Sequence, residues 1–119
     1  MTRILITTIA LVLVAAVALA SPRAKPRVAV VLAGQAAERA DLRQQVERAG
    51  VELRIPRSAA DQLGATHLLA ADRYATVIAV GADRRVAIDP VAHRYPGTRF
   101  LVEPADRKVL QAALEAAET

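Results

Sequence analysis

Short apolar runs alternate with segments of helical spacing between residues 28 and 118, and this alternation constrains the fold more than any other feature. The runs VAVVLAG at 28–34 and YATVIAV at 74–80 carry no charge and end at or just before a glycine, which is typical of strands buried on both faces. VELRI at 51–55 alternates apolar and charged residues and predicts a half-exposed edge strand, and TRFLVE at 98–103 predicts a fourth strand.

Four strand–helix repeats with short connections predict an α/β fold in which helices cover both faces of a parallel sheet. The expected strand order is 2-1-3-4, numbered along the chain. This is a three-layer sandwich with the first and last helices on one face and the other two helices on the opposite face.

The helical segments are predicted from apolar spacing and from end signals. A helix over 37–49 places Leu42, Val46 and Ala49 on one face and ends at Gly50. Ser58 is predicted to cap a helix that continues to Ala71.

Proline positions shape the last two helices. In the segment 82–95, Pro90 predicts a break, with Asp89 capping a short helix that begins at Pro90. A closing helix is expected within 104–118, with Pro104 near its first turn. Its inward residues are expected to be Val109, Leu110, Ala113 and Leu114.

The first twenty residues have the pattern of an export signal. Arg3 precedes the charge-free run Ile4 to Ala20, which closes on the small-residue pattern Ala18-Leu19-Ala20. We therefore predict a signal peptide at 1–20, a Pro-containing linker at 21–27 and a single α/β domain at 28–119. The alternative is an uncleaved anchor that contacts the membrane through residues 4–20. The basic residues that follow it, Arg23, Lys25 and Arg27, keep open a second topology of that anchor, in which they lie on the cytoplasmic side.

Composition narrows the classes of function. The absence of cysteine excludes disulfides, thiolate metal sites and a lipid-modified cysteine. The 16 basic residues outnumber the 12 acidic ones, but they are scattered along the chain. With only three aromatic residues as well, no nucleic-acid partner is expected.

Enzyme motifs are missing from the predicted strand ends. The chain has no G-x-G-x-x-G, no phosphate-binding P-loop and no G-x-S-x-G, and its two histidines, His67 and His93, fall in predicted helical segments. We therefore expect no enzymatic activity, no catalytic residue, no cofactor and no metal site.

Ligands of doubly wound sheets bind at the carboxyl ends of the strands, near the point where strand order reverses. Arg57 and Ser58 follow one of the predicted strands at this end of the sheet. Arg84 and Arg85 lie at the start of a predicted helix, where they could bind an anionic ligand or simply be exposed to solvent. The candidate ligand-binding residues are Gly34, Gln35, Gly81, Asp83, Arg84 and Glu103.

The segment LLAADRYATVIAVGADRRVAIDPVAHRYPGTRFLVE at 68–103 resembles part of a known family. It is similar to the amino-terminal lobe of the basic membrane protein (BMP) family, the substrate-binding proteins of purine nucleoside and related ABC importers. The matching positions are Tyr74, Val80-Gly81, Val91-Ala92, Tyr95-Pro96 and Phe100. The resemblance extends weakly from about Arg27 and covers one partial lobe.

The resemblance implies a periplasmic-binding-protein-like lobe, with Glu103 near the place of the family's ribose-binding carboxylate. Family members have two lobes, and they usually carry an aromatic residue where this chain has Ala82. We therefore expect an extracytoplasmic domain whose binding of a small molecule such as a nucleoside is reduced, or depends on a homodimer, with an ABC permease as a further partner. The alternatives are a membrane-tethered interaction or sensor domain without a small-molecule ligand, and a gene fragment.

Overall fold

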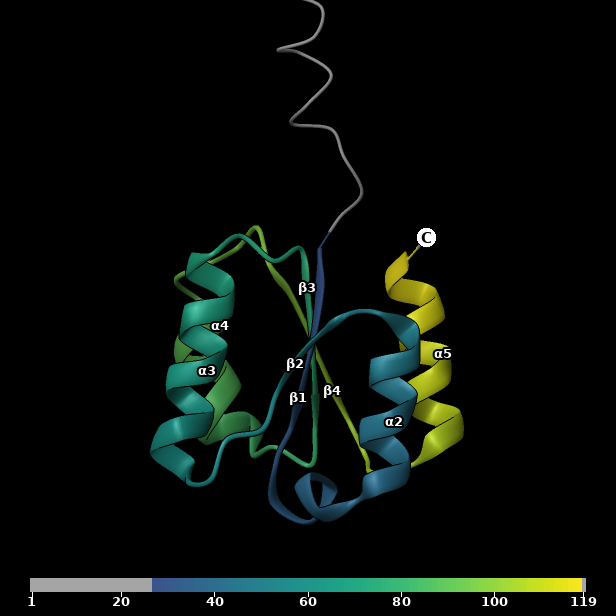
Figure 1. The fold of residues 1–119 in the computed structure, drawn as a ribbon. Coiled ribbons are helices and arrows are strands. Elements are labelled where there is room, and N and C mark those ends of the chain that lie inside the picture. The colour runs from purple at the N-terminus through teal and green to yellow at the C-terminus, as the bar shows by residue number, and fades with distance from the viewer. Residues whose placement is uncertain (1–26, 119) are drawn as a thin grey trace, which may run out of the picture.

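A four-stranded parallel sheet with helices on both faces forms the core of the protein (Figure 1). The computed structural model describes residues 27–118, so the expected signal peptide or anchor at 1–20 and most of the linker lie outside the described residues. The strands are β1 (Val28–Leu32), β2 (Glu52–Arg54), β3 (Thr76–Val80) and β4 (Arg99–Glu103). Their order, β2-β1-β3-β4, confirms the predicted fold class and topology. The likeness to a periplasmic-binding-protein lobe stays a prediction.

The helices divide between the two faces as expected. Helices α2 (Ala40–Ala49) and α5 (Arg107–Glu118) cover one face. On the other face lie α3 (Ala59–Ala71), the π-helical turn η3 (Arg84–Ile88) and the short α4 (Asp89–Ala92). A 3₁₀ helix, η2 (Gly34–Glu38), connects β1 to α2.

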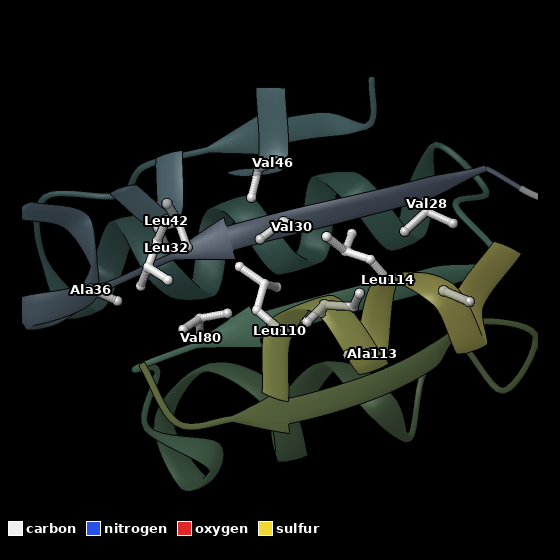
Figure 2. Packing of buried hydrophobic residues seen from close by; sticks show 12 residues of the cluster. Val28, Val30, Leu32, Ala36, Leu42, Val46, Val80, Leu110, Ala113 and Leu114 are labelled. Atoms are coloured by element: carbon white, nitrogen blue, oxygen red, sulfur yellow. The ribbon is translucent and has the colours of Figure 1, made fainter. Parts of the chain in front are cut away.

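The two central strands are buried along their whole length, because helices cover them on both sides. The register pairs Val30 of β1 with Leu53 of β2 and with Ile78 of β3. On the α2–α5 face, buried side chains from β1, β3, η2, α2 and α5 form the larger apolar cluster (Figure 2). Its buried members are Val28, Val30, Leu32, Ala36, Leu42, Val46, Ile78, Val80, Leu110, Ala113, Leu114 and Ala117.

The opposite face has smaller clusters, which use the alternate residues of the same strands. Buried Thr66 of α3 donates its hydroxyl to the Ala87 carbonyl at 2.7 Å and so joins α3 to η3. The sandwich therefore has one large and one divided apolar layer.

The first helical segment differs from the expected single helix over 37–49. It is divided at Arg39, which has extended backbone (φ −83°, ψ 100°), into η2 and α2. The division lets Ala36 of η2 pack into the core while Leu42 and Val46 of α2 do the same. Gly50 ends α2 with φ 71°, as expected.

The predicted break before Pro90 is wrong. Helical structure begins at Arg84, with the carboxylate of Asp83 as its cap, and continues directly into α4, where Asp89 is the first residue rather than the cap. The Asp89 N–H reaches back to the Arg84 carbonyl, five residues away. This wider turn accommodates Pro90, which has no N–H and would crowd an ordinary helical turn.

The closing helix starts later than expected. Pro104 precedes it, and Asp106 Oδ1 accepts the N–H groups of Lys108 and Val109 at 2.9 and 3.0 Å, so Asp106 is its cap. Val109 is only half-buried, whereas Leu110, Ala113 and Leu114 point inward as predicted.

Candidate functional site

The strand order reverses between β1 and β3, so the predicted ligand crevice lies at the carboxyl ends of these two strands. The Ala33 N–H donates to the Val80 carbonyl at 2.9 Å. Beyond this hydrogen bond the segments that follow β1 and β3 turn away from each other through Gly34 (φ +56°) and Gly81 (φ +73°). Both glycines have left-handed backbone, which other residues adopt only at a cost.

Protein atoms approach Gly81 closely on one side of this crevice. A Cβ on Gly81 would lie 2.6 Å from the Ala33 carbonyl oxygen and 3.2 Å from the Ala36 Cβ. Ala36 is itself 1% exposed, because η2 folds onto the end of β3. The Ala33 backbone and the Ala36 methyl group therefore leave no room for a side chain at position 81, whereas Gly34 and Gly81 themselves are exposed.

The six candidate residues fall into three sets. Gly34, Gly81 and Glu103 come together through the backbone, since the Gly81 N–H donates to the Glu103 carbonyl at 3.2 Å. Asp83 Oδ1 accepts the Arg85 N–H at 3.0 Å and serves as a helix cap. Gln35 and Arg84 lie exposed at the surface.

None of four surface hollows formed by residues 27–118 is lined by these six residues. One of about 740 Å³ lies between α2 and α5, and one of about 720 Å³ lies at the amino ends of β1 and β2. The concave surface of the domain is thus separate from the predicted site.

The hollow between α2 and α5 is polar. Gln45 Nε2 donates to the Arg107 carbonyl at 2.8 Å and to Gln111 Oε1 at 3.2 Å, which joins the two helices. At its rim, Arg39 Nε and Nη2 donate to the two carboxylate oxygens of Asp41 at 2.8 and 2.7 Å. These bonds hold the pKa of Asp41 at about 2, below its ordinary value.

The two histidines have different surroundings. His67 Nε2 lies 3.4 Å from the Tyr95 hydroxyl with the rings edge to face, and His93 is exposed. Within residues 27–118, His, Asp and Glu side chains form no group of three or more that would suit a metal ion.

Arg27 connects the linker to the domain at the opposite end of the sheet. Its guanidinium lies 4.0 Å from the centre of the Tyr74 ring, and it donates to the carbonyl and the carboxylate of Asp72. These contacts hold the start of β1 against the turn that follows α3. The chain therefore enters the domain at the amino ends of the strands, away from the switch point.

Helix α3 has a surface that the sequence analysis missed. Leu68 is 68% exposed, and Leu63 on the same helix is 37% exposed. Only Asp61 is formally charged among its 13 residues, whereas the shorter helices α2 and α5 carry four charged residues each. A count of charges per predicted helix would have revealed it, since a helix that is apolar all round is ordinarily covered on all sides.

A groove runs between this outer face of α3 and the segment that follows β2. Its volume is about 370 Å³. The lining residues are Arg54, Ile55, Pro56, Ala60, Asp61, Gly64, Ala65 and Leu68. Ile55 is 40% exposed, so both walls of the groove present apolar side chains to solvent.

Comparisons of the chain with protein families, curated proteins and solved structures return no match. The relation to the BMP family therefore stays a prediction. None of the helices described between residues 27 and 118 combines the length and the apolar character that crossing a bilayer requires.

Proposed function

We propose that this chain is an extracytoplasmic, non-enzymatic domain that works by binding the apolar surface of another protein along α3. The observation that carries the proposal is the outer face of α3, which exposes Leu68 beside the groove at Ile55. We call this area, residues 54–56 with the outer face of α3, the α3 surface.

The energetic argument rests on burial. Covering a fully exposed leucine with apolar surface contributes about 1.5–3 kcal/mol, and exposed apolar patches on soluble domains commonly mark binding sites. The other outer helices, α2 and α5, have charged outer faces and offer no comparable gain. A protein partner that covers the α3 surface would therefore be selected by apolar fit.

Export is the second part of the proposal, and it depends on the sequence. Arg3, the apolar run Ile4 to Ala20 and the terminal Ala18-Leu19-Ala20 support a signal peptide or an anchor. A cleaved signal peptide, or an anchor whose amino end stays on the cytoplasmic side, would present the domain outside the cytoplasmic membrane.

A second candidate is the nucleoside-type binding lobe that the family resemblance implies. The sheet order 2-1-3-4 and the meeting of Gly34, Gly81 and Glu103 favour it. Ala36 packed over Gly81 argues for lost ligand binding. Calorimetric titration of the purified protein with purine nucleosides is expected to give no binding heat at about millimolar ligand, and saturable heat would favour the lobe instead.

The main proposal is tested by site-specific photo-crosslinking in cells that express the full chain. A photoreactive amino acid at position 68 is expected to give a discrete crosslinked product. Position 112, exposed on α5 over the opposite face, is the matched control and is expected to give none. Absence of a product at position 68, or equal products at both positions, would contradict the role of the α3 surface.

A further inference from the structure

The strand β4 forms the edge of the sheet opposite β2 and has an unusual composition for an edge. Its sequence RFLVE places three apolar residues between one basic and one acidic residue, and Phe100, Leu101 and Val102 are only half-buried. Natural edge strands ordinarily carry a charge, a proline or a bulge in the middle, which prevents pairing with another strand. In β4 the charges lie only at the two ends.

The backbone of β4 shows which groups remain available. The Arg99 N–H donates to the Ala75 carbonyl at 2.8 Å, and the Glu103 carbonyl accepts the Gly81 N–H at 3.2 Å. Because backbone direction alternates along a strand, Leu101 also turns toward β3. Phe100 and Val102 therefore direct their N–H and C=O groups away from the sheet.

Arg99 and Glu103 are opposite charges on one face of this strand. They lie on the same face as Leu101, which packs against the α2–α5 cluster. Within residues 27–118 neither side chain takes part in an ion pair. They cannot pair with each other, because four residues of strand separate them by about 13 Å.

The opposite edge behaves differently. In β2, Glu52 and Arg54 are two residues apart on one face and form an ion pair with each other. The charges of β2 therefore pair with each other, whereas those of β4 have no ion-pair partner among residues 27–118.

We propose that β4 pairs in antiparallel fashion with β4 of a second copy of this chain, about a two-fold axis at Leu101. In this register Arg99 lies opposite Glu103 of the second copy, and Glu103 lies opposite its Arg99. Phe100 lies opposite Val102 of the second copy, an aromatic and β-branched pair that stabilises antiparallel sheets. The outward backbone groups of Phe100 and Val102 then form the narrow hydrogen-bonded pairs of the ladder.

The β4 sequence favours a second copy of this chain over an unrelated strand because it is complementary to itself in antiparallel orientation. A two-fold interface requires that each residue meets the residue at the mirrored position, and RFLVE meets that requirement in charge and in shape. The resulting sheet would continue through both copies. The inference does not rest on the proposed function, since the α3 surface with its groove lies beside β2, at the far edge of the sheet.

Charge reversal tests the register. The full chain is expressed with export, and the purified protein is examined by sedimentation equilibrium from about 1 µM to 1 mM. The wild-type protein is expected to dimerise. Arg99→Glu and Glu103→Arg each place two like-charged pairs across the axis and are expected to weaken association roughly tenfold or more.

Combining the two reversals is the decisive step. An equimolar mixture of Arg99→Glu and Glu103→Arg proteins is expected to form a heterodimer, because every pair across the axis is then of opposite charge. The double variant in one chain is expected to regain the wild-type dimer, which also shows that the substitutions leave the fold intact. Arg54→Glu on the opposite edge is the matched control and is expected to leave association unchanged.

Two outcomes would overturn the proposal. One is a wild-type protein that stays monomeric at about 1 mM. The other is a dimer that the charge reversals at 99 and 103 do not affect, which would locate the interface elsewhere. Neither outcome bears on the crosslink at position 68, so failure of this inference is distinguishable from failure of the proposed function.

Discussion

Gly81 carries two constraints at once, a left-handed backbone (φ +73°) and the close approach of Ala33 and Ala36. Gly64 in α3 carries neither, since nothing lies within 4 Å of the position that its Cβ would take. The fold therefore requires glycine at position 81 but not at position 64.

Gly81→Ala is expected to lower the free energy of unfolding by about 2 kcal/mol or more, because it combines left-handed strain with a clash against backbone. Gly64→Ala, the matched control, is expected to raise the free energy of unfolding by about 0.5–1 kcal/mol through helix propensity. Chemical denaturation measures both. A neutral Gly81→Ala variant would show that η2 moves away easily.

The carboxyl group of Asp41 has a lowered pKa, so its effect on the pH dependence of stability can be predicted. The bidentate hydrogen bonds from Arg39 lower its pKa from the ordinary 3.8 to about 2 in the folded state. The ion pair therefore stabilises the fold above the ordinary pKa, and this stabilisation is lost as the pH falls from about 4 to about 2.

In Arg39→Gln, the pKa of Asp41 is expected to rise toward its ordinary value, and stability is expected to depend less on pH in this window. Titration of the Asp41 carboxyl by NMR measures the change. Arg43→Gln is the control, because Arg43 donates to the Ala37 carbonyl rather than to Asp41. An Asp41 pKa that is unchanged in Arg39→Gln would contradict the assignment.

At the scale of elements, α3 differs from the other long helices because it is apolar on its outer as well as its inner face. Neighbouring residues illustrate this, since Leu69 is 2% exposed and Leu68 is 68% exposed. Leu69 belongs to an apolar core cluster, whereas the side chain of Leu68 stays largely exposed to solvent.

Leu69→Ala is expected to cost about 2–5 kcal/mol of stability because it leaves a cavity in the core. Leu68→Ala is expected to change stability by no more than about 0.5 kcal/mol, as for other surface substitutions. Thermal or chemical denaturation measures the two effects. If α3 serves a partner, Leu68→Ala is also expected to weaken the crosslink formed from a second position on the α3 surface, such as 60, without affecting the fold. Equal destabilisation by the two variants would show that Leu68 supports the fold instead.

At the scale of the whole molecule, the sheet has two edges with different properties. The charges of β2 pair with each other, whereas β4 carries end charges around an apolar centre that form no ion pair within the described part of the chain. Pairing of two copies through β4 would leave both α3 surfaces available, at the outer ends of one continuous sheet.

Amide hydrogen exchange is expected to report this pairing at residue level. The amides of Phe100 and Val102 point away from the sheet, so their exchange is expected to slow as protein concentration rises. The Leu101 amide already points toward β3 and serves as the internal control. Exchange of Phe100 and Val102 that is independent of concentration would contradict pairing through β4.

Fold class, strand order and the division of the helices between the faces follow from the sequence alone. Apolar periodicity distinguishes strands from helices, and the right-handedness of strand–helix–strand units then restricts the topology. Local end signals such as Ser58 and Gly50 were also predicted, because each acts within a few residues of itself.

Contacts between distant residues decided the rest. Ala36 meets Gly81 only after the sheet has formed, so their close approach has no signature in either segment. Pro90 is tolerated because a wider turn precedes it, and Thr66 joins that turn to α3. The exposure of Leu68 and the outward direction of the β4 backbone depend on which surfaces the other elements leave uncovered. The sequence determined what must be buried to make this fold, and only the tertiary structure decided which apolar surfaces remain for a partner.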